Sequence, residues 1–165
     1  VVPVRALGGP RASYVEINRG LAEGLSSIGA AVTVTGHGKT LSPDAGACFG
    51  APAPGEIIAD ERKLVGSAQL RVGDALLQHG SILIDGDQSL LNQLTGKLHD
   101  AVHPATLRSM LGIVHQDQVT FSVIDGLKHV LGGSWEEGEY LSGERNEAGR
   151  LERQRYSQAG WTWRR

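Results

Sequence analysis

The fold is decided by residues 62–83, which read RKLVGSAQLRVGDALLQHGSIL. Two runs of strand-forming residues, 62–69 and 75–84, lie on either side of a turn at Gly73, and a third run at 56–59 precedes them. Connections this short predict antiparallel pairing, because parallel neighbours need a crossover of a dozen or more residues. The sequence therefore predicts a meander of three strands at the centre of the chain.

Helical patterns lie on both sides of this meander. Apolar residues recur at steps of three and four from Tyr14 to Ile28, Ser13 and Glu16 have the spacing of a capping box, and Gly29 is expected to end the helix. Further helices are predicted at 88–94, at 104–111 with Pro104 in the first turn, at 121–131 and at 144–156, and a short strand at 31–35. Strands and helices in separate blocks indicate an α+β domain.

The bulk composition excludes several classes of function. The 165 residues suit one domain, and 16 basic against 18 acidic residues predict neither nucleic acid nor a membrane surface as a partner. No apolar run approaches the roughly 20 residues of a membrane helix, and the single cysteine suggests a reducing, cytoplasmic location. The only methionine is Met110, and residues 1–10 resemble neither an initiation region nor a targeting peptide, which suggests further residues upstream.

Cys48 lies in a predicted long loop, residues 36–55, rich in Gly, Pro, Ala and Ser. Long loops inside compact domains are more often functional than idle. A free cysteine is most often a small buried hydrophobic residue. A nucleophilic Cys48 would need its thiolate, which a nearby ammonium such as that of Lys63 would favour. The residues alone leave both readings open.

Lys63 also has two readings. It is expected to share a strand face with Val65 and to precede the small residues Gly66, Ser67 and Ala68, which permit close approach of a ligand. It could be a solvated edge lysine, or a partly buried one that directs its ammonium at a carbonyl oxygen or accepts a proton from an amine.

On the next strand, His79 and Ser81 are expected on one face, with Gln78 and Gly80 on the other. A hydrolase built from Cys48 and His79 is a weaker alternative, because no Asp or Asn is indicated to orient the imidazole. The histidines have no recognisable metal spacing, and no phosphate-binding or dinucleotide fingerprint occurs, so the sequence predicts no metal.

The paired strings at 62–69 and 75–83 resemble the central motifs of the lipoate-protein ligase and octanoyltransferase family, also called the biotin/lipoate A/B protein ligases. The helix that begins Ser13-Tyr14 and the closing Arg155-Tyr156 with Trp161 are similar to that family too. The resemblance implies that residues 1–165 form a single partial catalytic domain, its C-terminal two-thirds. The implied fold is a mixed, largely antiparallel sheet flanked by helices.

The resemblance also implies roles for particular residues. Lys63 matches the lysine that contacts the acyl carbonyl, and Cys48, within Ala-Cys-Phe, matches the nucleophile of the cysteine-using octanoyltransferases. The positions that match the lining of the acyl pocket are Gly66, Ser67, Ala68, Gln78, His79, Gly80 and Ser81. The implied reaction moves octanoate from acyl carrier protein to a lysine of a lipoyl domain, in 2-oxoacid dehydrogenases or in the glycine cleavage H protein, without ATP or another cofactor.

Two departures from the family pattern keep alternatives open. The upstream Arg-Arg-x-Thr-Gly-Gly segment, which forms another wall of the acyl site, is absent. The arginine frequent just after the alanine-aromatic or alanine-glutamine pair is also displaced: position 70 is Leu70, and the arginine is Arg71. The alternatives are an ATP-dependent lipoate-protein ligase in which Cys48 is incidental, an amidotransferase between lipoylated proteins, and a non-catalytic half-domain that needs a partner chain.

Overall fold

The computed structural model describes residues 1–36, 49, 52–86 and 104–164. The chain divides into two compact units, Val1–Gly133 and Ser134–Arg165. Each unit is considered by itself. The larger unit contains the sheet and all the residues of the central meander.

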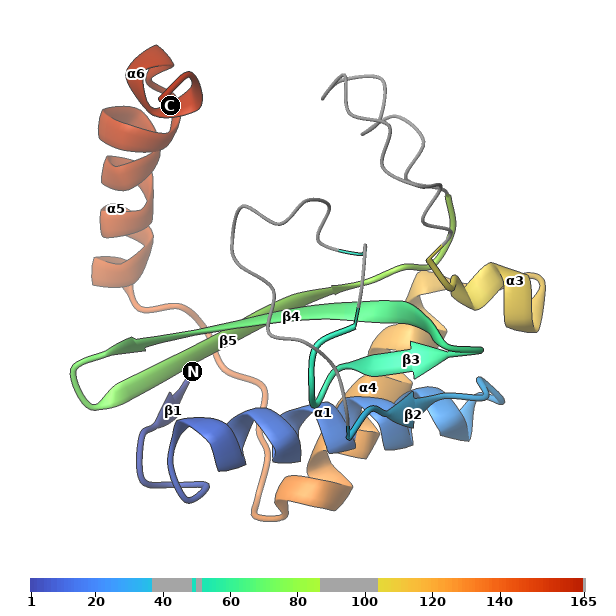
Figure 1. Cartoon of the computed structure of the whole chain (residues 1–165). Helices are drawn as coiled ribbons and strands as arrows, with labels where there is room; N and C mark the ends of the chain where they lie inside the picture. The colour runs from blue at the N-terminus through green and yellow to red at the C-terminus, as the bar shows by residue number, and fades with distance from the viewer. Residues whose placement is uncertain (37–48, 50–51, 87–103, 165) are drawn as a thin grey trace. The chain divides into compact units, whose positions relative to one another are not determined.

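The sheet has five strands in the order β1-β5-β4-β3-β2 (Figure 1), and each neighbouring pair is antiparallel. The strands are β1 (Val2–Pro3), β2 (Thr33–Val34), β3 (Ile57–Ala59), β4 (Arg62–Val72) and β5 (Ala75–Ile82). This confirms the predicted meander and the short preceding strand. The two turns show why it forms: Gly73 between β4 and β5 has φ 58°, while Asp60 and Glu61 between β3 and β4 have φ 49° and 60°. Positive φ values match the right-handed twist of a tight hairpin.

Two long helices, α1 (Pro10–Ser27) and α4 (Gln116–Leu131), pack against each other on one side of the sheet (Figure 1). Glycines let them approach closely. A Cβ at Gly24 would overlap the carbonyl oxygen of Ser122, and one at Gly126 would overlap that of Gly20. The hydrophobic core lies between the sheet and the helices that cover this face. Its fully buried large side chains are Leu25, Ile57, Leu64, Val65, Leu76 and Leu107.

Several predicted helix starts were wrong. The first helix begins at Pro10 rather than at Ser13, whose buried hydroxyl instead donates to the carbonyl of Gly9 (2.8 Å), so no capping box forms. The helix predicted from Pro104 is the short α3 (Leu107–Leu111), where the hydroxyl oxygen of Thr106 accepts from the amide of Ser109 (3.1 Å). The helix α4 starts before the predicted residue 121, and the helix predicted at 88–94 lies outside the described residues.

The smaller unit consists of α5 (Ser142–Leu151), a π-helical turn η1 (Glu152–Tyr156) and α6 (Ala159–Thr162), with no buried residue in any of them. The predicted helix at 144–156 is therefore present, with a changed geometry in its last turn. Tyr156 meets Trp161 edge to face with ring centroids 5.0 Å apart, and Arg155 stacks 4.3 Å from the same Trp161 ring. Trp163, two residues further on, is 79% exposed.

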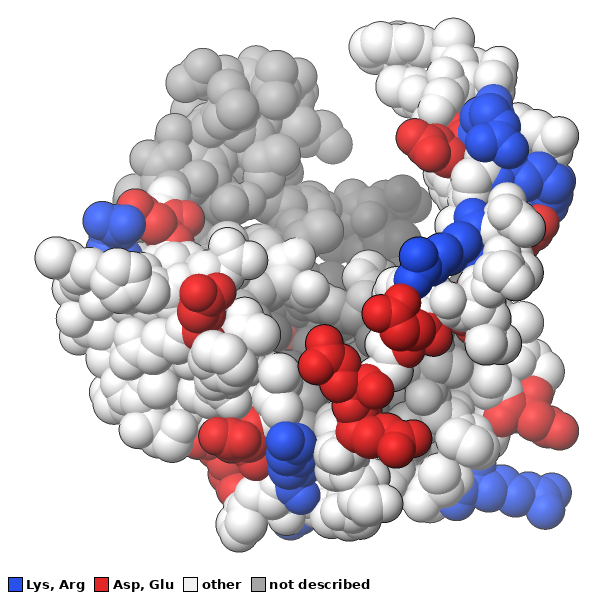
Figure 2. Space-filling view, turned by 180° about the vertical axis from the view of Figure 1, so that it is seen from behind, with Lys and Arg blue, Asp and Glu red and all other residues white. Residues whose placement is uncertain are grey.

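The surface of the described residues mixes both signs of charge. Figure 2 shows basic side chains standing beside acidic ones on the face that it draws. Exposed ion pairs in the described residues include Arg150 with Glu147 and Arg108 with Asp85. Among the described helices, none has the length and apolar character needed to span a membrane.

Candidate functional site

A β-bulge in β4 decides where Lys63 points. Ile57 of β3 pairs with Val65, but the next residue, Ile58, pairs with Lys63, which leaves Leu64 as an extra residue in β4. A bulge of one residue reverses the alternation of side chains beyond it. Leu64 and Val65 both enter the core with Ile57, and Lys63 points to the opposite face. The prediction that Lys63 and Val65 share a face was therefore wrong.

This reversal brings Lys63 onto the same face as part of the predicted acyl pocket. Beyond the bulge, Gly66 and Ala68 lie on the face turned away from the core, and they pair across the hairpin with Ser81 and His79. The Lys63 Cε lies 3.6 Å from the position that a Cβ on Gly66 would occupy, so the lysine stem runs over this glycine. We call this set, with Lys63 at its end, the lysine face.

Lys63 itself is buried in an ion pair. Its Nζ is 2.8 Å from Oε1 of Glu56, and the two side chains are only 8% and 5% exposed. The ring of Phe49 lies with its centroid 5.7 Å from the same nitrogen, within reach of a cation–π interaction. Because β4 is a central strand between β3 and β5, the reading of Lys63 as a solvated edge lysine was wrong.

Glu56 is the site residue that the sequence reasoning missed. Its second oxygen, Oε2, accepts a hydrogen bond from the amide of Ala53 (2.7 Å). One signal could have found it: Glu56 is a charged residue at the start of an otherwise apolar strand run, one tight hairpin away from Lys63. Opposite charges on two neighbouring strands, such as those of Glu56 and Lys63, favour a cross-strand pair.

The other predicted pocket residues lie on the helix face of the sheet. The Ser67 hydroxyl (3.1 Å) and the Gln78 amide nitrogen (3.3 Å) both donate to Oδ1 of Asn18 in α1. Gly80 pairs with Ser67, and a Cβ there would lie 2.5 Å from the carbonyl oxygen of Gly66. The structure thus divides the seven predicted residues between the two faces of one hairpin.

Tyr14 connects α1 to the same region. Its hydroxyl donates to the carbonyl of Ser67 (3.4 Å), and its ring packs against Gly55, next to Glu56. Burial and, second, the negative charge of Glu56 raise the pKa of the Tyr14 hydroxyl above its ordinary value of 10.0. Tyr14 therefore stays protonated at neutral pH.

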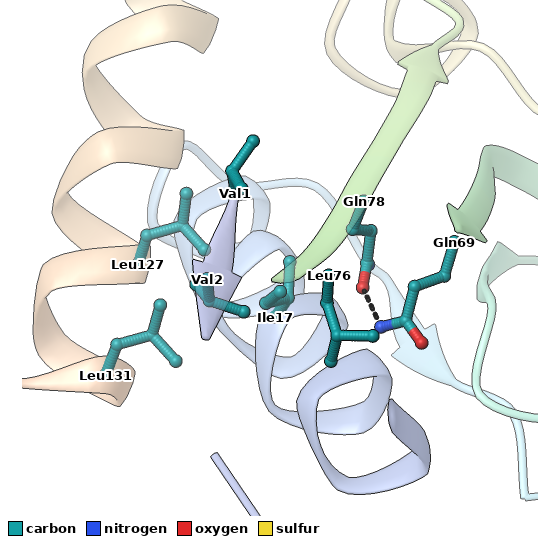
Figure 3. A pocket seen from close by; sticks show the side chains of 8 residues that line it. All are labelled: Val1, Val2, Ile17, Gln69, Leu76, Gln78, Leu127 and Leu131. Atoms are coloured by element: carbon teal, nitrogen blue, oxygen red, sulfur yellow. Dashed lines mark hydrogen bonds between the residues drawn. The ribbon is translucent and has the colours of Figure 1, made fainter. Parts of the chain in front are cut away.

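Two cavities open on the helix side of the sheet, away from the lysine face. One of about 170 Å³ lies between β1, β5, α1 and α4 (Figure 3), where Gln69 and Gln78 form its polar wall and bond to each other at 3.3 Å. A groove of about 320 Å³ lies between β5 and α4, lined mainly by apolar side chains such as Ile82, Val119 and Val123. Lys63 lines neither cavity, but each includes one residue predicted for the acyl pocket, Gln78 in the first and Gly80 in the second.

Cys48, the predicted nucleophile, lies outside the described residues. Phe49, which directly follows it in the sequence, is described and contacts both Lys63 and Gly66. Within the residues that the structure describes, no group of three or more His, Cys, Asp or Glu side chains is arranged to hold a metal ion.

No protein-family model matches the chain. Curated relatives do: the octanoyltransferase LipM of Kyrpidia tusciae is 34% identical over 155 residues, which are 84% of this chain and 57% of the relative. The LipM of Clostridioides difficile is 30% identical over 146 residues, 81% of this chain and 54% of the relative. The LipM of Moorella thermoacetica is 45% identical over 80 residues, 47% of this chain and 29% of the relative. The chain thus spans little more than half the length of the Kyrpidia tusciae and Clostridioides difficile relatives.

Solved structures agree on the fold. A lipoate-protein ligase A bound with ATP superposes with a TM-score of 0.74 at 20% identity over 92% of this chain and 58% of its own. A putative lipoate protein ligase from T. acidophilum gives a TM-score of 0.71 at 21% identity, over 92% of this chain and 57% of its own. Both the sequence relatives and the fold agree with the resemblance carried by the two central motifs. The chain therefore has the fold of the lipoate-protein ligases, and its sequence is similar to part of the LipM octanoyltransferases.

Proposed function

We propose that this chain carries the acyl-transfer site of an octanoyltransferase, which moves an octanoyl group from acyl carrier protein to a lysine of a lipoyl domain in the cytoplasm. The observation that carries the proposal is the lysine face: a buried cation, Lys63, stands at the end of an open strip formed by Gly66, Ala68, His79 and Ser81. The similarity to LipM octanoyltransferases supports the choice of acyl group.

In the proposed first step, the Cys48 thiolate attacks the thioester carbonyl of octanoyl-acyl carrier protein. The donor's carbon–sulfur bond breaks, its thiol leaves, and a new thioester forms on Cys48. One thioester replaces another, so the step needs no ATP. Phe49, the neighbour of Cys48, contacts Lys63 and Gly66, which supports a place for the thiol beside the lysine face.

In the second step, the ε-amine of a lysine on the apo lipoyl domain attacks the octanoyl thioester. An amide forms, the bond to Cys48 sulfur breaks, and the departing thiolate takes the proton that the amine releases. A lipoyl-domain acceptor is supported by a solved structure of similar fold, described as a bi-partite lipoate protein ligase and its E2 lipoyl domain from Thermoplasma acidophilum. In our proposal the acceptor is a lipoyl domain of a 2-oxoacid dehydrogenase or the glycine cleavage H protein.

Lys63 stabilises the oxygen that becomes negative in both steps. Among the described residues, Glu56 takes one of the three N–H donors of the Lys63 ammonium. In our proposal another of these donors is directed at the acyl carbonyl. A buried cation directed at a developing oxyanion acts in a low-dielectric site, where it is worth more than in water.

The test is intact-mass spectrometry after mixing the chain with octanoyl-acyl carrier protein and then with apo lipoyl domain, without nucleotide. One octanoyl group should appear on the protein with donor alone, be released by hydroxylamine, and disappear in Cys48→Ala. Lys63→Ala should slow both steps by roughly 10²- to 10⁴-fold, the range for a positioned group that assists catalysis. Undiminished transfer by Cys48→Ala would exclude the thioester route.

The ATP-dependent lipoate ligase is the first alternative. It is favoured by the fold shared with a lipoate-protein ligase A bound with ATP. Arg71, displaced from the position frequent in the family, bonds to the carbonyl of Gly73 (2.8 Å) in its own turn. Transfer that depends strictly on ATP and free lipoate would establish the ligase and reject the transferase.

A second alternative is a half-domain that works only when a further segment completes it. Within the described residues, the edge of β5 that pairs with β1 at Ala75 and Leu76 has no strand partner from Leu77 to Ile82. The apolar groove between β5 and α4 adjoins this strand. An additional strand, in cis or on a second chain, could pair there and bury its apolar side chains. Transfer should then require the upstream family segment, and full activity of the 165 residues alone would reject this reading.

A further inference from the structure

Glu56 is buried beside the proposed chemistry without being assigned any step in it. It is 4% exposed, and its two oxygens bind different parts of the chain. Oε1 binds the Lys63 ammonium at 2.8 Å, and Oε2 accepts from the amide of Ala53 at 2.7 Å. One carboxylate therefore connects the lysine of β4 to the segment that precedes β3.

Phe49 adds a second connection between the same two regions. Its ring lies 5.7 Å from the Lys63 nitrogen, and a ring carbon lies 3.4 Å from the position of a Cβ on Gly66. Phe49 and Ala53 both belong to the chain that runs from Cys48 to β3. The Lys63 ammonium thus meets a ring and a carboxylate that are both supplied by the residues that follow Cys48.

We infer that Glu56 is the positioning residue of this site: its carboxylate binds the Lys63 ammonium and the Ala53 amide at once, and so fixes the direction in which the ammonium points. The inference rests on the proposed function, because it gives Glu56 a role only through Lys63. It adds a residue that neither the sequence motifs nor the resemblance indicated.

The role requires a carboxylate rather than a side chain of that size. Both partners of Glu56 are N–H donors, and a carboxylate has two oxygens to receive them. A glutamine has one oxygen, so its NH₂ group would face either the ammonium or the Ala53 amide, donor against donor. Glu56→Gln therefore changes charge and hydrogen bonding at nearly constant volume.

The experiment measures both half-reactions at saturating donor in wild type, Glu56→Gln, Lys63→Ala and the double variant, using the form of the protein that proves active in the transfer assay above. Glu56→Gln should slow transfer by about 10²-fold with the donor KM little changed, as misplacement of a catalytic group by on the order of 1 Å does. In the Lys63→Ala background it should add no further loss. Glu61→Gln, an exposed change in the same hairpin, is the matched control and should keep the wild-type rate.

The outcomes separate the inference from the proposed function. A wild-type rate in Glu56→Gln, or a full additional loss in the Lys63→Ala background, would overturn the positioning role while leaving the transferase intact. A Lys63→Ala protein with normal rates would instead reject the proposed function. If Glu56→Gln does not fold, Glu56→Asp keeps the charge on a shorter side chain: a reduced rate supports the role, and a wild-type rate overturns it.

A second readout needs no activity. Acetic anhydride modifies free amines, and peptide mass spectrometry compares Lys63 with Lys128, an exposed reference on α4. In folded Glu56→Gln the modification of Lys63 should rise by about 10-fold, because its nitrogen is no longer held in the ion pair with the carboxylate. Modification of Lys128 should not change. An unchanged Lys63 rate in the folded variant would show that Glu56 does not control this amine, and would overturn the inference.

Discussion

Asn18 is the residue through which α1 holds the sheet. It is fully buried, its Nδ2 donates to the carbonyl of Gly55 (2.7 Å), and its Oδ1 accepts from Ser67 and Gln78. A buried amide with all its partners present rigidifies the elements that it joins. The residues that the motif suggested for acyl binding are, in this part of the hairpin, bound to a helix.

Asn18→Ala should lower the free energy of unfolding by about 2 to 3 kcal/mol, because it leaves the Gly55 carbonyl and its other partners buried without a bond. Urea unfolding measures the loss. The matched control is Arg19→Ala, next to it in α1, whose half-exposed side chain pairs only with Glu16 and should change the free energy by less than about 0.5 kcal/mol. Equal losses in the two variants would show that the Asn18 bonds do not contribute.

Tyr14 should make the protein less stable in alkali. Its pKa is raised in the folded state, by burial first and by Glu56 second, so an unfolded tyrosine loses its proton at a lower pH than the folded one. The stability from this group is complete below about pH 10 and declines as the pH rises above that value. Tyr14→Phe should flatten this decline in urea unfolding measured from pH 9 to 11. An identical alkaline decline in both proteins would contradict the assignment.

At the scale of the elements, the contact between α1 and α4 depends on glycine. Gly20 and Gly24 on α1 and Gly126 on α4 bring the two backbones together, so that a Cβ would meet main-chain atoms of the other helix. Main-chain atoms cannot turn away as a flexible side chain can. The helices must separate to accommodate a methyl group.

Gly24→Ala should therefore destabilise the protein. Overpacking costs about 1 to 3 kcal/mol, which outweighs the roughly 1 kcal/mol by which alanine is the better helix former. The control is Gly143→Ala in α5, where nothing lies within 4 Å of the added Cβ, and where the same exchange should be neutral or stabilising. Thermal unfolding followed by circular dichroism compares them. Stabilisation by both would show that the helices adjust without cost.

At the scale of the whole molecule, the two units differ in what holds them together. In the described part of the chain, every buried hydrophobic residue lies in Val1–Gly133, whereas α5, η1 and α6 contain no buried residue. The smaller unit is held by contacts such as the Arg155 stack on Trp161 and the Arg150–Glu147 pair. Exposed ion pairs of this kind contribute little stability.

Hydrogen exchange should separate the units. Amides of α1 and of the β4–β5 hairpin should exchange only through global unfolding, whereas those of α5 should exchange by local opening at a much lower free energy. Native-state exchange followed by peptide mass spectrometry measures both. Protection of α5 equal to that of β4 would show that the smaller unit has burial beyond what the described contacts supply.

Local sequence was sufficient for much of this fold. The meander follows from tight turns between runs of strand formers, and α1 follows from apolar spacing. Both depend on neighbours within a few residues. The two motifs at 62–69 and 75–83 likewise carried the resemblance that the LipM relatives and the ligase structures support. Helix starts were less accurate: α1 begins at Pro10 rather than at Ser13, and the helix predicted from Pro104 begins at Leu107, after the N-cap Thr106.

The tertiary structure alone decided the arrangement of the candidate site. Counting alternate residues along β4 places Lys63 with Val65, but the extra residue Leu64 depends on how β3 pairs with β4, so the face of Lys63 is a property of two strands. The Glu56 partner follows from the same pairing. Asn18 accepts hydrogen bonds from Ser67 and Gln78 because α1 packs on that face of the sheet. These partners lie about 50 to 60 residues from Asn18 in the sequence, a separation that no local sequence pattern spans.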